Sequence, residues 1–281
     1  MEFDIHGDFI RKEHFRWTGA LNISRNISKV LDINGGPFSD PNDRNALNLG
    51  TSVVKEGEPL GLLYGRVATG IIKTEEQLAA AKEAFPSYTI FDPYLDLGDI
   101  AFEYEDRYWK EDVIGRSTPD FFGGYTNTIT WKGFTLTALF TFSYGNDLIY
   151  QKDVSDSGMS SLANRGTRVL NHYSETNTSS NRPRSMWSTT YMLTSLNVYD
   201  ASYLKLKTLT LNYNLPASIC QKIRIKSASV YGTATNVFTL TSYPGPDPEV
   251  SDDPGSVIGG GRDASTYPTV KSYTFGIRIG F

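Results

Sequence analysis

Strict two-residue alternation of apolar and polar side chains recurs in long segments of this chain. The last ten residues, SYTFGIRIGF, show it most clearly, with an apolar side chain at every second position from Tyr273 to Phe281. Successive side chains of a strand point to opposite faces, so the pattern predicts a strand with one apolar and one polar face. An aromatic residue at the very end of such a strand suits a boundary between hydrocarbon and water.

Four further segments alternate in the same way and are long. They span residues 2–10, 15–24, 121–131 and 134–144. Strands of soluble proteins typically have about 5–6 residues, whereas a tilted strand that crosses a bilayer needs about 9–11. Segment length therefore favours membrane-crossing strands. Weaker alternation brings the prediction to about nine strands, adding residues 47–56, 60–70, 203–215 and 223–240.

The predicted connections alternate between short and long. The short ones are residues 11–14, 57–59, 132–133 and 216–222, and the long ones are about 34–46, 73–120, 151–201 and 241–267. Outer-membrane barrels have short periplasmic turns and long extracellular loops, whereas a soluble meander has no reason to separate loop lengths by end. The predicted fold class is therefore all-β, a portion of an antiparallel transmembrane β-barrel with long extracellular loops.

Aromatic residues gather beside the predicted short turns. In transmembrane barrels such residues form girdles at the membrane interfaces. If the short turns are periplasmic, the final strand also ends on that side. We therefore predict that six aromatic residues anchor one rim of the barrel: Phe15, Trp17, Trp131, Phe134, Tyr213 and Phe281.

One short helix is predicted inside a long loop, in the sequence KTEEQLAAAKEAFP. Thr74 is placed as its N-cap, Gln77 completes a capping box, and Pro86 follows the end. No segment approaches the roughly 18 apolar residues of a transmembrane helix. The first residues, MEFDIHGDFI, alternate from the start and do not resemble a signal peptide. Any targeting signal is therefore expected outside this chain.

Composition argues against several other functions. The net charge of −4 offers no basic surface for nucleic acid. One cysteine, Cys220, and three scattered histidines provide neither a disulfide nor the spacing of zinc ligands. Cys220 has no histidine nearby in the sequence, and Gly259–Gly261 lacks the strand-before, helix-after context of a phosphate loop. We predict no enzyme activity, no cofactor, no metal site and no nucleic-acid partner.

Ordered motifs along the chain resemble those of a known family. They are EGEPLGLLYGRVATGI (56–71), GDI (98–100), IGRSTPDFFGGYTNTITWKGFTL (114–136), ASYLKLKTLTLNYNLP (201–216), NVFTLTSYPGPDPEV (236–250) and YPTVKSYTFGIRIGF (267–281). Over nearly all of its residues the chain thereby resembles the SusC/RagA family of TonB-dependent outer-membrane transporters.

The resemblance implies a 22-stranded barrel with an internal plug, of which residues 1–281 are the C-terminal portion, without the plug domain or the TonB box. Known members lie in the outer membrane and import oligosaccharides or peptides. They pair with a SusD-like surface lipoprotein that closes over the barrel mouth. The implied partners are this lipoprotein, outer-membrane lipid and, only through the absent plug, the TonB complex.

Two groups of loop residues are candidates for contacts. Sugar rings stack on aromatic faces, which makes loop aromatics ligand candidates, the alternative being packing within the loops themselves: Tyr108, Trp109, Trp187 and Tyr191. Four acidic residues follow Tyr243-Pro-Gly and are candidates for contact with substrate or with the lid lipoprotein, the alternative being a solvated, turn-rich loop: Asp247, Glu249, Asp252 and Asp253.

Two functions remain open from the sequence. The first is part of an outer-membrane nutrient importer, and the second is a secreted β-sandwich that binds carbohydrate through exposed aromatics. Under the first hypothesis the isolated chain is expected to be inactive, because an open sheet presents unpaired N–H and C=O groups at both edges.

Overall fold

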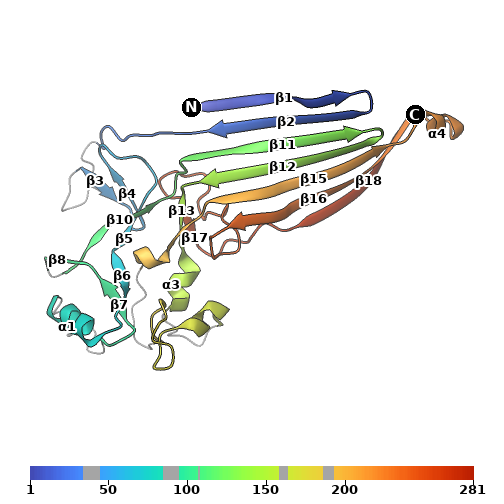
Figure 1. Cartoon of the computed structure of the whole chain (residues 1–281). Helices are drawn as coiled ribbons and strands as arrows, with labels where there is room; N and C mark the ends of the chain where they lie inside the picture. The colour runs from blue at the N-terminus through green and yellow to red at the C-terminus, as the bar shows by residue number, and fades with distance from the viewer. Residues whose placement is uncertain (34–44, 85–94, 107, 158–163, 186–192) are drawn as a thin grey trace.

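A seven-stranded antiparallel sheet dominates the computed structural model, which describes residues 1–33, 45–84, 95–106, 108–157, 164–185 and 193–281 (Figure 1). We call it the large sheet. Its strands, in spatial order, are β1 (Glu2–Lys12), β2 (Phe15–Ser24), β11 (Phe121–Trp131), β12 (Phe134–Tyr144), β15 (Tyr203–Asn214), β16 (Ser227–Thr241) and β18 (Ser272–Gly280).

The prediction of about nine strands in one meander is wrong for the third and fourth. These segments instead belong to a separate four-stranded sheet in the order β10-β5-β4-β3. Val53 and Leu63 are 2% and 1% exposed, so these strands are buried within a small core rather than divided into an apolar and a polar face. The four strands are β3 (Ala46–Asn48), β4 (Ser52–Lys55), β5 (Leu62–Arg66) and β10 (Glu111–Arg116).

Smaller elements complete the connections between the long strands. The described strands are β6 (Ala68–Ile71) with β7 (Ile100–Phe102), β8 (Tyr104–Glu105) with β9 (Tyr108–Trp109), and β13 (Asp147–Tyr150) between β14 (Val198–Asp200) and β17 (Arg262–Asp263). The described helices are α1 (Glu75–Ala84), α3 (Gln151–Ser157), α4 (Ala217–Lys222) and the 3-10 turns η1 (Thr167–Asn171) and η2 (Ser195–Asn197).

Helix α1 confirms the predicted loop helix and its capping box. The backbone N–H of Gln77 donates to the Thr74 hydroxyl at 3.2 Å, and the Gln77 side-chain oxygen accepts from the Thr74 N–H at 3.2 Å. Pro86 lies outside the described residues. The expectation of a single helix is wrong, because α3 and α4 also form and are too short to show helical periodicity in the sequence. Within the described part of the chain, no helix has the length and apolar character needed to span a membrane.

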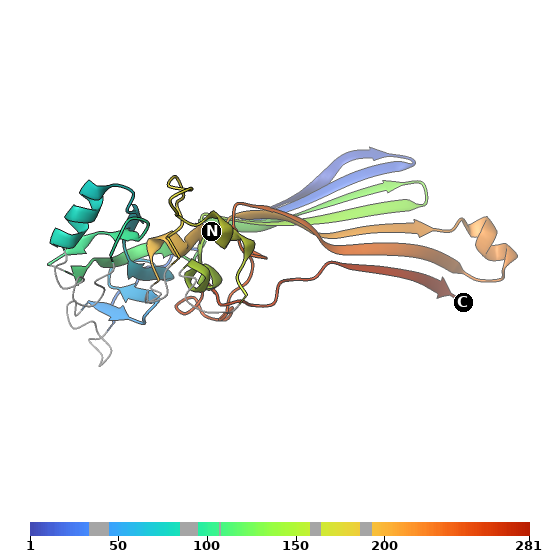
Figure 2. The same ribbon diagram turned by 90° about the horizontal axis from the view of Figure 1, so that it is seen from below.

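The predicted separation of long and short connections is confirmed except at residues 57–59, which join β4 to β5 inside one long connection instead of forming a turn of the large sheet. Residues 25–120, 145–202 and 242–271 all leave the same end of the large sheet and form the smaller sheets and most helices (Figure 1). At the opposite end the strands are joined through residues 13–14, 132–133 and 215–226. Turned by 90°, the large sheet is a curved wall extending from the cluster of loop elements, with α4 beyond its far end (Figure 2).

Cross-strand register aligns the apolar residues of the large sheet in rows. Leu136 lies opposite Ile129 on β11 and Leu211 on β15, and Phe140 lies opposite Tyr125. Paired residues project to the same face, so these rows form one continuous apolar face. It is open: Phe275 on the edge strand β18 is 83% exposed.

The opposite face of the large sheet is polar. Thr137 pairs with Thr128 on one side and Thr210 on the other, and Thr210 pairs with Thr233. The hydroxyls of Thr210 and Thr233 are 3.0 Å apart. Buried hydrophobic clusters lie instead within the connections, around Ile72 and around Leu148. The large sheet is therefore a two-faced wall, and the connections carry their own small cores.

Candidate functional site

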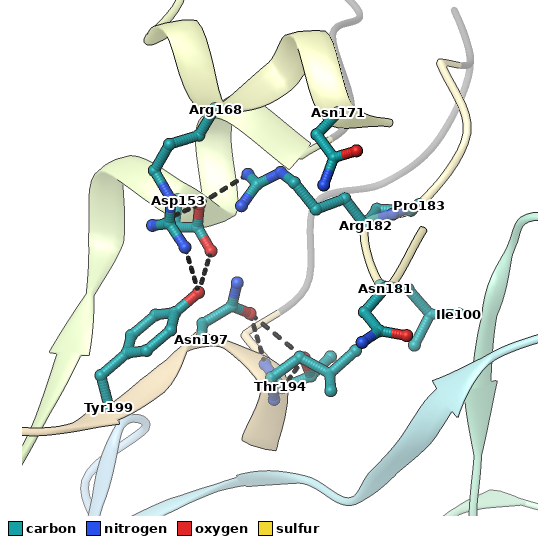
Figure 3. Close-up of a pocket in the computed structure, with 11 residues that line it drawn as sticks. Ile100, Asp153, Arg168, Asn171, Asn181, Arg182, Pro183, Thr194, Asn197 and Tyr199 are labelled. Carbon is teal, nitrogen blue, oxygen red and sulfur yellow. Dashed lines mark hydrogen bonds and ion pairs between the residues drawn. The ribbon is translucent and has the colours of Figure 1, made fainter. Parts of the chain in front are cut away.

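A polar pocket of about 450 Å³ lies among the long connections (Figure 3). Asp153 of α3 lies on one side of it and is 4% exposed. One guanidinium nitrogen of Arg182 donates to Asp153 Oδ1 at 2.6 Å, and the Tyr199 hydroxyl donates to Oδ2 at 2.6 Å. Arg168 approaches the same carboxylate at 3.4 Å. Side chains from α3, η1, residue 182 and β14 thus meet at one carboxylate.

The opposite side of the pocket is built on the turn η2. Thr194 donates from both its hydroxyl and its backbone N–H to the side-chain oxygen of Asn197, each at 3.1 Å. Asn181 is held by the ammonium group of Lys73, which donates to its side-chain oxygen at 2.9 Å. Asn171 also lines the pocket. Amide groups of Asn171, Asn181 and Asn197, from three segments, therefore line the pocket together with the charged groups, as Figure 3 shows.

The pocket carries more positive than negative charge. Among its described lining residues, the guanidinium groups of Arg168 and Arg182 face the single carboxylate of Asp153. Burial raises the pKa of Tyr199, and the neighbouring carboxylate of Asp153 raises it further, so the hydroxyl stays protonated and donates. Hydroxyl, amide and guanidinium groups together suit hydrogen bonding to a polar ligand.

Sequence reasoning missed the residues of this pocket. A weak signal was available, since Arg165, Arg168, Arg182 and Arg184 are concentrated in one turn-rich loop region. What the sequence did not indicate is that the short helix α3 supplies one carboxylate, Asp153, shared by Arg168 and Arg182, whereas Arg184 pairs with Asp99.

The described aromatic ligand candidates do not line this pocket. Tyr108 and Trp109 form β9, which pairs with β8. The Arg66 guanidinium lies over the Trp109 ring, 4.8 Å from its centre, so Trp109 is engaged in packing. Tyr108 is 71% exposed. Trp187 and Tyr191 lie outside the described residues. Ligand contact by these aromatics stays a prediction.

Two of the four acidic candidates hold their loop on the large sheet. Lys205 on β15 is 1% exposed, and its ammonium group contacts Asp247 Oδ1 at 3.0 Å and also bonds to Glu249. Lys207 reaches Glu249 at 2.9 Å. We call these four residues the loop latch. Asp247 is 4% exposed, which corrects the expectation of a solvated carboxylate or one in contact with a partner: this carboxylate is buried against Lys205 of the large sheet.

Electrostatics favour the charged form of both latch carboxylates. Burial alone would raise the pKa of Glu249, but hydrogen bonds from Lys205, Lys207 and Tyr203 outweigh it and hold the pKa below its ordinary range. Burial is likewise outweighed at Asp247, where the Thr269 hydroxyl, the Glu249 N–H and Lys205 lower the pKa. Of the other candidates, Asp252 pairs with Arg262 at 2.6 Å and Asp253 lies on the exposed surface.

Four of the six predicted rim aromatics form one row. Phe15 is opposite Trp131, Trp131 is opposite Phe134, and Phe134 is opposite Tyr213, with 4.4 Å between the ring centres of the last pair. Trp17 lies one aligned row further from the turns, opposite Ile129. Phe281 follows β18 and is 83% exposed. The anchoring role of this row stays a prediction.

Comparisons with known proteins agree along the whole chain. The TonB-dependent receptor P3 of Formosa agariphila is 31% identical over 290 residues, covering 100% of this chain and 28% of the receptor. The TonB-dependent receptor SusC of Bacteroides thetaiotaomicron is 23% identical over 296 residues, covering 100% of this chain and 26% of that protein. No family model matches the chain.

The chain is also similar to a solved structure of the RagAB peptide transporter, with a TM-score of 0.73 and 23% sequence identity. The similarity covers 100% of this chain and 29% of the solved chain. The fold is thus that of a portion of an antiparallel transmembrane β-barrel. The chain belongs to the SusC/RagA family of TonB-dependent outer-membrane transporters. It spans less than a third of the length of these relatives.

Proposed function

We propose that the chain forms the C-terminal part of the barrel of an outer-membrane nutrient importer. The observation that carries the proposal is the two-faced wall, apolar along the rows of Leu136 and Phe140 and polar along the row of Thr137. Such a wall separates lipid from an aqueous lumen. The isolated wall would be inactive, because the edge strands β1 and β18 each have one neighbour in the described sheet.

The proposal includes a SusD-like surface lipoprotein as partner. All three long connections leave one end of the wall, which supports a large recognition surface at the barrel mouth. Energy would come from the TonB complex through a plug domain that these residues do not form. The related solved complex is named a peptide transporter, and we propose either peptides or oligosaccharides as the imported class.

Within this importer, the polar pocket around Asp153 is the proposed contact site for the imported molecule. Its guanidinium, hydroxyl and amide groups suit the hydroxyls of a sugar or the amides and carboxylates of a peptide. The competing β-sandwich module has less support. A sandwich covers its apolar face with a second sheet, whereas Phe275 and Ile277 on the large sheet are 83% and 69% exposed.

Uptake in a strain that lacks the receptor tests the proposal. The strain is complemented with the wild-type receptor, with Arg168→Gln, or with Arg11→Gln as a matched control, because Arg11 lies on β1 far from the pocket. Growth on an oligosaccharide mixture and on a peptide mixture is measured, and the lipoprotein partner is sought by co-purification. Deletion should abolish growth on one mixture, and Arg168→Gln should weaken it while the control grows normally. Unchanged growth of the deletion strain on both mixtures would refute import.

A further inference from the structure

The turn between β15 and β16 differs from the two other turns at its end of the large sheet. Those consist of residues 13–14 and 132–133, whereas this one contains helix α4 and extends beyond the strand ends (Figures 1 and 2). Cys220 on α4 is 1% exposed, while Ile219 and Ile223 are 46% and 57% exposed. The two isoleucines, four residues apart, form an exposed apolar stripe on one side of the helix.

Basic side chains accompany this stripe. Lys222, Arg224 and Lys226 are all exposed, and no acidic residue occurs between Ala217 and Val230. The backbone N–H of Lys226 donates to the carbonyl of Gly280 at 2.9 Å, which fixes the turn against β18. Strand β18 contains Arg278 and no acidic residue. This corner of the wall therefore combines apolar side chains with concentrated positive charge.

An apolar groove of about 600 Å³ begins beside the turn, on the open face of the wall. Gly232 on β16 forms its floor, between Leu211 on one side and Phe275 on the other. Ala234 continues the floor between Leu209 and Tyr273. The groove exists because two small residues on the central strand lie between rows of larger ones.

The dimensions of the groove match one leaflet of a bilayer. Its lining on β16 runs from Val230 to Ala234, a distance of about 13 Å at the rise of a strand. The hydrocarbon of one leaflet is about 15 Å thick. Tyr213, at the end of the groove nearest the turn, lies four positions before Ala217, the first residue of α4. One molecule can therefore reach both the groove and the basic turn.

We propose that the groove and the turn together bind one anionic glycerophospholipid. An acyl chain occupies the groove over Gly232, and the phosphate group contacts Lys222 and Lys226. The wall as a whole contacts lipid without regard to charge, whereas this corner selects a negative headgroup. The inference rests on the membrane-barrel fold and not on the proposed substrate or partner, so either can fail without the other.

Native mass spectrometry of the purified receptor that carries this chain tests the proposal. The receptor in detergent is titrated with phosphatidylglycerol or with phosphatidylcholine of the same acyl chains. Wild type is compared with Lys222→Gln/Lys226→Gln and with the control Arg11→Gln/Lys12→Gln. The control removes two positive charges at the end of β1, beside the turn of residues 13–14. We expect wild type and control to retain phosphatidylglycerol about tenfold more than phosphatidylcholine. The Lys222/Lys226 variant should lose that preference.

A second variant, Gly232→Leu, separates the groove from the charge. Even a Cβ at this position would lie 3.2 Å from the Phe275 ring, so leucine fills the groove. It should lower retention of both lipids and leave their ratio unchanged. Heat-modifiable migration in gels checks that each barrel is folded. If the Lys222→Gln/Lys226→Gln barrel does not fold, Lys222→Gln alone takes its place, and its preference for phosphatidylglycerol should fall about threefold. Equal binding of both lipids by wild type, or equal losses in both double variants, would overturn the proposal.

Discussion

The indole N–H of Trp17 on β2 donates a hydrogen bond to the side-chain oxygen of Asn127 on β11, with 2.6 Å between the two atoms. Asn127 is the polar exception in an otherwise apolar row, and Gly19 lies directly opposite it. The bond satisfies a polar group on a face that we assign to lipid, where an unsatisfied one is costly. Trp17→Phe should lower the free energy of unfolding by about 1–3 kcal/mol, measured by denaturant titration of the receptor in vesicles. The double variant Trp17→Phe/Asn127→Leu should recover most of the loss, and a failure to recover would show that the bond is not its cause.

The two faces of β12 should tolerate arginine differently. Ala138 lies in the apolar row and Thr137 in the polar row, one position apart at the same depth. Ala138→Arg should cost about 2–4 kcal/mol of folding free energy in vesicles, and Thr137→Arg much less. Equal costs at the two sites would contradict the assignment of lipid and lumen faces, and a larger cost at Thr137 would reverse it.

The loop latch should depend on Lys205 more than on Lys207. Lys205 is 1% exposed and bonds to both Asp247 and Glu249, whereas the Lys207 side chain is 38% exposed. Lys205→Met leaves two carboxylates without their buried partner, and we expect local opening of residues 243–270 to become easier by about 3–5 kcal/mol. Hydrogen exchange of that loop measures the opening, with Lys207→Met as the control of smaller effect. Equal exchange in both variants would contradict a central role for Lys205.

Acidification should release the same loop. The pKa values of Glu249 and Asp247 lie below their ordinary values of 4.5 and 3.8 in the folded protein. Their contribution is therefore fully present above those values and is lost as the pH falls through the lowered ones. Exchange of residues 243–270, corrected for its intrinsic pH dependence, should be constant from neutral pH down to about 5 and rise below about 4. The Lys205→Met variant should show a smaller rise, because only the weaker partners of the two carboxylates, Lys207 and Thr269 among them, remain to be lost.

Two glycines on the large sheet should respond oppositely to alanine. A Cβ on Gly123 of β11 would overlap the backbone oxygen of Asn22 on β2, whereas a Cβ on Gly7 of β1 would meet no atom within 4 Å. Gly123→Ala should therefore destabilise the barrel by about 1–3 kcal/mol, and Gly7→Ala should be neutral or slightly stabilising. Thermal unfolding of the two variants, followed by loss of heat-modifiable migration, distinguishes them. Equal midpoints would show that the close approach at Gly123 is relieved without cost.

The strands of the large sheet could be predicted because the alternation that specifies each of them is a local feature of the sequence. Alternation around Phe134–Tyr144 specifies a strand, its two faces and its length without knowledge of any neighbour. The short strand Ser52–Lys55 was misplaced because a strand buried within a small core has no alternation that distinguishes it from a weak wall strand. Helix α4 was missed because six residues are too few to display a helical period.

The pocket and the latch were beyond local reasoning for a different reason. Asp153 and Arg182 are 29 positions apart, and Lys205 and Asp247 are 42 apart. A lysine in a predicted barrel strand is interpreted as a lumen-facing residue until the loop that covers it is known. Acidic residues in a turn-rich loop are likewise interpreted as solvated, because their buried lysine partner cannot be identified from the sequence. Pairings of this kind follow from tertiary structure, which the pattern of residue types does not specify.

The departure of every long connection from one end of the wall makes the protein modular for engineering. Residues 25–120 and 145–202 begin and end at neighbouring strand positions. Residues 242–271 run from Thr241, which pairs with Tyr203 on β15, to Ser272, which pairs with Thr235, so each connection is a cassette whose two ends are fixed by strand pairing. A chimaera that keeps the strands of this chain and takes its cassettes from a related receptor preserves every row of the wall. Residues 242–271 are the exception that needs a matched graft, because the donor cassette must supply carboxylates for Lys205 and Lys207 or be transferred together with β15.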